Sequence, residues 1–292
     1  MQGNIVVRSL LGVGMAIWGE ARMGAEAAAL LASPVWRGSG VPAGASRPVL
    51  LVPGFLAGDS SMTLMSNWLK RVGYGVHGSG IVANVECSER AVTKLEGRVI
   101  DLSEQYGEPV SIIGHSRGGM FARVLAVRQP HRVASIITLG SPLVPSMNDL
   151  HPLLRFQIRA LQRVQKASGE GLLANSCEQS FQDHQDCIEG RGCCRQFWAD
   201  LDDDMPEQVR FSSIYSRSDG VLHWRSCLDH QAELVEVQSS HCGMACNARV
   251  FAAIGDRLAV EPYVRPVAAS PVVAAAPRRA AATARARAER VL

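Results

Sequence analysis

The sequence predicts an α/β fold with a mostly parallel, doubly wound sheet. Short apolar runs of strand length alternate with longer segments whose apolar residues have helical spacing. Residue types that are used in catalysis follow the ends of three of these runs, and the carboxyl ends of parallel strands share one edge of a sheet. At 292 residues, 47% of them hydrophobic and 20% charged, the chain has the size and composition of a globular protein with one sizeable core.

The expected elements follow in order from these patterns. Strands are expected at residues 48–52, 75–84, 109–114, 133–139, 209–216 and 232–238, and helices at 5–32, 62–72, 88–106 and 117–128. Residues 47–142 and 209–262 then form the core, and residues 1–46 supply a helix and a linker that pack on it. Residues 143–208 form an insertion of helix and loop, which we expect to act as a lid over the carboxyl edge of the sheet.

The most specific motif is Gly-x-Ser-x-Gly at residues 114–118. It follows the apolar run 110–113 and precedes a segment with helical spacing, which is the strand–turn–helix context that this motif requires. A serine on so sharp a turn leaves room only for glycine two residues before it and two residues after it. Ser116 is therefore the candidate nucleophile, and the alternative is a glycine-rich turn that only packs a helix on the sheet.

A nucleophilic serine needs a base and a carboxylate that orients the base. Asp219 comes just after the strand expected at 209–216, and His241 comes after the strand at 232–238. Parallel strands would bring both loops over Ser116. Asp229 is the alternative acid, and His115 is expected to be structural because it lies within the turn.

The oxyanion hole is expected from the loop after the first strand, which reads Pro53–Gly54–Phe55–Leu56. Gly54 permits close approach of the backbone. The N–H of Phe55 is the first choice of donor and that of Leu56 the second, with the N–H of Arg117, directly after the serine, as the other donor.

The motifs VLLVPGFLA, IIGHSRGG, ITLGSP, YSRSDG and SHCGM, in this order, resemble bacterial lipases and esterases of the α/β-hydrolase superfamily. The resemblance covers about residues 47–258. It implies an α/β-hydrolase fold and a Ser116–Asp219–His241 triad. The chain departs from common patterns in lacking a His-Gly pair after the first strand and in having Arg117 after the serine, which favours a polar or anionic feature near the acyl site.

These residues predict a serine carboxylic-ester hydrolase that acts on small-molecule or lipid esters without a cofactor or a metal. Two alternatives stay open: a lipid acyltransferase with the same triad, and a non-catalytic binding protein of this fold. An apolar acyl chain is expected because five apolar residues would line the site, although core packing explains the last three of them nearly as well. These residues are Phe55, Leu56, Met120, Leu143 and Val144.

The formal net charge of +3 arises from the last 30 residues, where six arginines stand against Glu289. Without them the chain is slightly acidic, so a nucleic-acid partner is not expected. The Ala-, Pro- and Arg-rich residues 263–292 are expected to be disordered and solvated, and transient contact with an anionic membrane surface is the alternative. Residues 5–32 resemble an amphipathic helix more than a signal peptide, which favours a cytoplasmic protein over an exported one.

The eight cysteines favour an exported protein instead, because four of them lie in the polar insertion, where disulfides could replace a hydrophobic core. The sequence favours at least one disulfide within the lid and a second one that joins Cys227 to Cys242. A zinc site is the alternative, but the lid cysteines lack the usual Cys-x2-Cys pairs. The four lid cysteines are Cys177, Cys187, Cys193 and Cys194. The acids of this segment are expected to form a solvated face.

Overall fold

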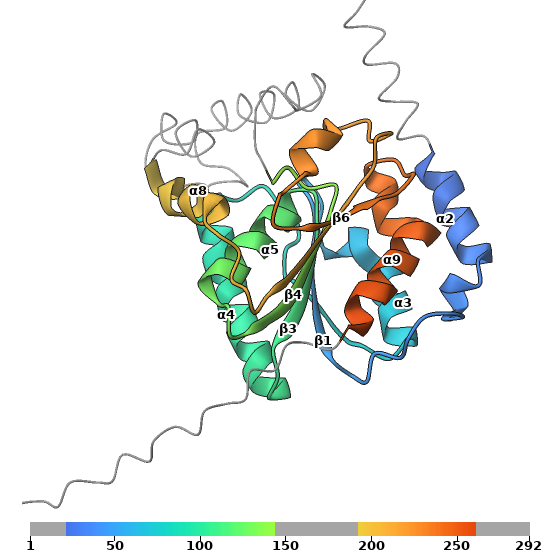
Figure 1. The fold of residues 1–292 in the computed structure, drawn as a ribbon, viewed down its shortest axis with the longest axis horizontal. Coiled ribbons are helices and arrows are strands. Elements are labelled where there is room, and N and C mark those ends of the chain that lie inside the picture. Colours follow the sequence, from blue (N-terminus) through green and yellow to red (C-terminus); the bar gives the residue numbers. More distant parts are fainter. Residues whose placement is uncertain (1–21, 144–191, 261–292) are drawn as a thin grey trace, which may run out of the picture.

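The computed structural model describes residues 22–143 and 192–260, which form three layers with a sheet between two sets of helices (Figure 1). Every pair of neighbouring strands in this sheet is parallel. The α/β fold with a doubly wound sheet is thus confirmed. In spatial order the strands are β2 (Gly75–Gly78), β1 (Pro48–Val52), β3 (Val110–His115), β4 (Val133–Leu139), β5 (Arg210–Tyr215) and β6 (Glu233–Glu236).

The strand register aligns the carboxyl ends of the strands at one edge of the sheet. Val52 of β1 pairs with Gly114 of β3, and Leu139 of β4 pairs with both His115 and Ile214. The loops that follow β1, β3, β5 and β6 therefore leave the sheet at the same edge, where open α/β sheets bind their ligands.

One face of the sheet is covered by α4 (Ser88–Tyr106), α5 (Arg117–Arg128) and α8 (Arg195–Asp202) (Figure 1). These helices bury apolar side chains against β1, β3 and β4. The core on this side includes Val92, Leu95, Phe121, Val124, Phe197 and Leu201.

The other face is covered by α2 (Met23–Ala32), α3 (Thr63–Arg71) and α9 (Ala248–Ala259), with Leu30, Trp68 and Phe251 buried among them. The side chain of Asn247 caps α9 by accepting from the backbone N–H groups of Arg249 and Val250. Five short 3₁₀ turns complete the described chain: Val35–Arg37, Asp59–Met62, Gly192–Cys194, Trp224–Cys227 and Cys242–Cys246.

The second strand is shorter than predicted, since β2 ends at Gly78 instead of residue 84. The carboxylate of Asp59 accepts from the backbone N–H groups of Ser79 at 3.1 Å and Gly80 at 2.8 Å, which turns the chain out of the sheet. Asn84 then lies against the β1 loop, where its side chain donates to the Pro53 carbonyl at 2.8 Å. A side chain 20 residues upstream thus ends the strand.

The end of the predicted lid belongs to the core. Phe197 and Leu201 of α8 are buried against α5, and Asp200 is 8% exposed and pairs with Arg128 at 2.6 Å. The expectation of a solvated acidic face is therefore wrong for Asp200. The rest of the predicted insertion, residues 144–191, lies outside the described residues.

The N-terminal helix predicted at 5–32 is described from residue 22 onward, where α2 packs beside α9 and the turn Cys242–Cys246. Residues 1–21 and the predicted tail at 263–292 lie outside the described residues. None of the described helices combines the length and the apolarity needed to cross a membrane.

Candidate active site

Ser116 lies on the turn between β3 and α5 with φ 53° and ψ −121°. A positive φ is strained for any residue with a Cβ and is retained mainly at functional sites. The flanking glycines make the turn possible. A Cβ on Gly118 would collide with the carbonyl oxygen of Val52, and one on Gly114 would collide with the backbone of Gly118. This is the geometry that the Gly-x-Ser-x-Gly motif predicts.

Asp219 and His241 form a buried pair. The Nδ1 of His241 lies 2.7 Å from Oδ2 of Asp219, and the two side chains are 6% and 1% exposed. The Oδ1 of Asp219 accepts from the backbone N–H groups of Val221 and Leu222, both at 2.8 Å. Because an ionised carboxylate only accepts hydrogen bonds, this pairing places the imidazole proton on Nδ1 and leaves Nε2 as the basic nitrogen.

His115 connects the histidine loop to the serine turn. Its Nε2 lies 3.0 Å from the carbonyl oxygen of His241, and the two imidazole rings are 5.0 Å apart between centroids. Burial, reinforced by the neighbouring His241, lowers the pKa of His115 to about 4, so His115 is neutral near pH 7. The neutral ring donates Nε2–H to that carbonyl, which fits the predicted structural role and holds the His241 loop next to Ser116.

The loop after β1 lies against the same turn. A Cβ on Gly54 would lie 3.0 Å from Cβ of Ser116, closer than nearly all Cβ contacts, so a glycine favours this close approach. The N–H of Leu56 donates to the carbonyl of Asn84 at 3.2 Å. Within the described part of the chain the N–H of Phe55 has no such acceptor, and Arg117, as the first residue of α5, has an N–H without an intrahelical acceptor. These two amides are those expected for the oxyanion hole.

Comparison with known proteins supports the same architecture. A family model described as alpha/beta hydrolase fold matches residues 105–191. Several hundred solved chains are similar in structure. The chain has the α/β-hydrolase fold. No curated protein matches the sequence.

Two of the similar structures are of the lipase BlEst2 from Bacillus licheniformis, at 15% sequence identity and a TM-score of 0.51. The alignment with the mature form covers 74% of this chain and 94% of the BlEst2 chain. The alignment with the propeptide form covers 78% of this chain and 53% of the BlEst2 chain. An aryl esterase described as putative, from Burkholderia cenocepacia, is 14% identical over 75% of this chain and 92% of its own, with a TM-score of 0.49. At 15% identity, what the chain shares with BlEst2 is the fold.

The side chain of Arg117 was expected to favour a polar or anionic feature near an acyl site, but it binds the segment that leads into α4. Its guanidinium donates to the side chain of Asn84 at 2.7 Å, to the carbonyl of Glu86 at 2.6 Å and to the hydroxyl of Ser88 at 2.9 Å. Burial lowers the pKa of Arg117 to about 10, so it stays charged at neutral pH. The cation holds the segment before α4 against the turn that carries Ser116.

The alternative acid, Asp229, is engaged elsewhere in the fold. Its Oδ2 lies 2.8 Å from Nε of Arg123, and both side chains are about 5% exposed. Arg123 also donates to the carbonyl of Asp203 at 3.0 Å, so this pair joins α5 to the segment after α8 and to the loop before β6. Asp219 is the acid that meets His241.

Glu26 of α2 is a residue that the sequence reasoning missed. Its carboxylate accepts from the backbone N–H of Ser240 at 3.0 Å and from the hydroxyl of Ser240 at 2.7 Å, directly before His241. A Cβ on Gly243 would collide with the same carboxylate. The N-terminal helix therefore anchors the histidine loop. Its sequence carries no motif that indicates this contact across more than 200 residues.

The predicted disulfide between Cys227 and Cys242 is wrong, because the structure does not join these residues; Cys227 is buried and Cys242 is exposed. Burial raises the pKa of the Cys227 thiol to about 12. Cys193 and Cys194 of the predicted lid are not bridged to one another or to another described cysteine. Cys177 and Cys187 lie outside the described residues.

The residues expected to line an acyl chain separate into two groups. Phe55 is half-buried and Leu56 is 48% exposed in the loop that follows β1. Met120 and Leu143 are buried in the core on the α4 and α5 side, and Val144 lies outside the described residues. Of the four described residues in this set, Phe55 and Leu56 keep exposed surface, and they directly follow Gly54, which approaches Ser116.

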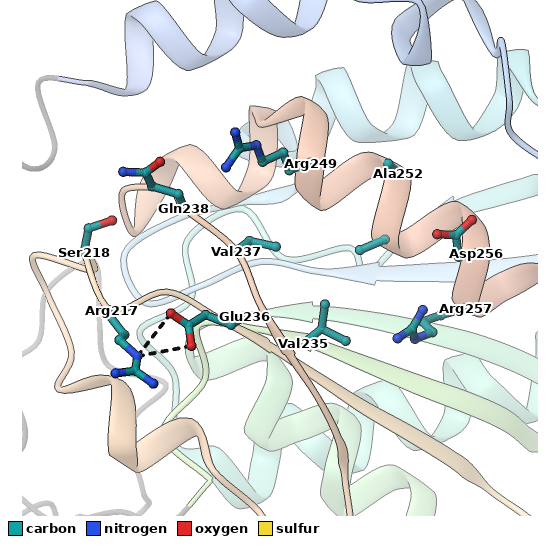
Figure 2. A pocket seen from close by; sticks show the side chains of 11 residues that line it. Arg217, Ser218, Val235, Glu236, Val237, Gln238, Arg249, Ala252, Asp256 and Arg257 are labelled. Atoms are coloured by element: carbon teal, nitrogen blue, oxygen red, sulfur yellow. Dashed lines mark hydrogen bonds and ion pairs between the residues drawn. The ribbon is translucent and has the colours of Figure 1, made fainter.

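An open groove of about 850 Å³ lies at the outer edge of the sheet, between β6 and α9 (Figure 2). Arg217 and Glu236 form an ion pair at 3.1 Å at one end, and Arg249 and Arg257 line the α9 side. None of the three expected catalytic residues lines this groove. The expected catalytic residues therefore lie outside this groove.

Proposed function

We propose that the protein is a serine carboxylic-ester hydrolase, with Ser116 as nucleophile, His241 as general base and Asp219 as the acid that orients the base. The observation that carries the proposal is the buried Asp219–His241 pair, held by His115 against a serine turn with positive φ. A nucleophile on a strained turn and an oriented imidazole are the parts that acyl transfer requires.

In the proposed reaction, Ser116 Oγ attacks the ester carbonyl while Nε2 of His241 takes its proton. The negative charge that develops on the carbonyl oxygen is met by the N–H groups of Phe55 and Arg117, each of which would contribute roughly 3 to 4 kcal/mol. The alkoxide departs with the proton from His241, and an acyl-enzyme forms on Ser116. Water, deprotonated by the same imidazole, then releases the acid and restores the serine.

The substrate class is a small-molecule or lipid ester with an apolar acyl group. The support is that Phe55 and Leu56 directly follow Gly54, which approaches Ser116, and that the Leu56 side chain is 48% exposed. A chain-length series of p-nitrophenyl esters tests this assignment, and we expect kcat/KM to rise with acyl length over the first members of the series.

A fluorophosphonate probe tests the nucleophile directly. We expect one label per chain on Ser116, and we expect Ser116→Ala to lose both labelling and ester turnover while it keeps the wild-type melting temperature. Ser135→Ala, a buried serine on β4, serves as the control and should label normally. Turnover near the wild-type level in Ser116→Ala would show that another residue is the nucleophile.

Adding an alcohol acceptor separates hydrolysis from acyl transfer. A hydrolase yields mainly free acid, whereas an acyltransferase yields the new ester even when water is in large excess. A chain that neither labels nor turns over any ester of the series would instead be a binding protein.

A further inference from the structure

Three cysteines from two distant segments meet beside the start of α4. Cys87 immediately precedes this helix, and Cys193 and Cys194 lie in the turn before α8. The Sγ of Cys87 is 3.4 Å from that of Cys193 and 3.3 Å from that of Cys194, and the last two sulfurs are 3.9 Å apart. Cys87 and Cys194 are buried, whereas Cys193 is exposed.

These separations fit thiolates that share a metal ion. A disulfide has sulfurs about 2.05 Å apart, well below the separations of these three. Thiolates on one tetrahedral Zn²⁺ lie about 3.8 Å apart, because each Zn–S bond is about 2.3 Å long. An ion about 2.3 Å from all three sulfurs would lie about 1 Å out of their plane, which leaves a fourth position for another ligand.

The charge next to the cluster favours a divalent ion. Arg117 binds the carbonyl of Glu86 and the hydroxyl of Ser88, the residues on either side of Cys87, so its guanidinium lies next to the sulfurs. Three thiolates and one divalent cation carry a net charge of −1, which this guanidinium balances. A monovalent ion would leave the half-buried site with an excess of negative charge, which is costly away from water.

We propose that Cys87, Cys193 and Cys194 form a Zn²⁺ site that ties the turn before α8 to the start of α4. Each thiol loses its proton to solvent as its sulfur binds the ion. The ion would then fix the segment that Arg117 holds against the nucleophile turn. Spacing within the insertion alone could not reveal this site, because one ligand lies more than 100 residues upstream.

Metal binding to the full chain tests the site without reference to activity. Protein reduced, freed of metal and titrated with Co²⁺ should bind one ion per chain, with the near-ultraviolet charge-transfer band of cobalt thiolates and the visible bands of tetrahedral cobalt. Zn²⁺ should displace it. Cys87→Ser should weaken binding by at least about 100-fold, since it removes one of three protein ligands. Cys246→Ser, on the opposite face of the sheet, is the matched control and should bind as the wild type does.

Alkylation gives a second measurement that needs no variant. With Zn²⁺ present, Cys87, Cys193 and Cys194 should react with iodoacetamide much more slowly than after removal of the metal with a chelator, as read by peptide mass spectrometry. A Co²⁺ spectrum without thiolate bands, equal binding by Cys87→Ser and wild type, or a disulfide from Cys87 to Cys193 or Cys194 in the isolated protein would each overturn the proposal.

Discussion

At the scale of single residues, the site depends on which carboxylate meets His241. Asp219→Asn should lower kcat by about 10⁴-fold, because an amide can hold the imidazole in the wrong tautomer. Asp229→Asn is the matched control. It leaves Arg123 buried without its carboxylate and should lower the free energy of unfolding by about 3 to 5 kcal/mol, with kcat of the folded protein changed only a few-fold. Steady-state kinetics and urea unfolding of both variants decide the matter, and the reverse pattern would make Asp229 the catalytic acid.

His115, a single residue, makes the free energy of unfolding depend on pH. Its pKa is about 4 in the folded protein and about 6.5 when unfolded, so between these values the unfolded chain binds a proton that the folded chain does not. Stability contributed by this group is complete above pH 6.5 and is lost as the pH falls towards 4. Between pH 7 and pH 5 the loss should be about 2 kcal/mol.

Urea unfolding at pH 7 and pH 5 measures this loss. His115→Gln should remove most of the stability loss between pH 7 and pH 5. His131→Gln, at an exposed position, should leave this loss unchanged. Equal losses in wild type and His115→Gln would contradict a neutral, buried His115.

At the scale of elements, α2 positions the histidine loop through Glu26. Charge-assisted hydrogen bonds of this kind contribute about 1.5 to 3 kcal/mol, and a glutamine can accept from only one of the two Ser240 donors. Glu26→Gln should therefore lower kcat roughly tenfold with KM nearly unchanged, and should lower Tm by several degrees. Glu104→Gln, whose side chain is 67% exposed, is the control. Wild-type kcat in Glu26→Gln would show that the contact only packs the helix.

The elements that the sequence predicts well are those whose pattern is local. Strands β1, β3 and β4 and helices α4 and α5 follow from apolar runs and helical spacing, and the serine turn follows from its glycines. The features that the sequence did not predict depend on contacts between residues that are far apart in the sequence. Asp59 ends β2 early, Phe197 and Leu201 draw a polar segment into the core, and Arg117 binds the carbonyl of Glu86. No local pattern encodes these pairings.

At the scale of the whole molecule, the Ala-, Pro- and Arg-rich tail should be dispensable for folding. A chain ending at residue 262 should keep its Tm within about one degree and should keep the proposed esterase activity, because the tail has too little apolar surface to dock on the core. Differential scanning calorimetry of the truncated and full chains measures this, and a drop of several degrees would show that the tail packs on the body.

The order of the strands in the sheet also determines when each strand can find its partner during synthesis. From β3 to β6 the sheet grows outward in the order in which the ribosome makes the chain, with Ser116 near its centre and His241 after its last strand. A nascent chain that has reached β4 already carries Ser116, but it presents the fully buried strand Val133–Leu139 as an open edge until β5 arrives some 70 residues later. Such edges invite pairing with other chains. Chains whose synthesis stalls in this interval would therefore lack His241 and be prone to aggregate. A chaperone that covers the open edge of β4 would matter most at this stage.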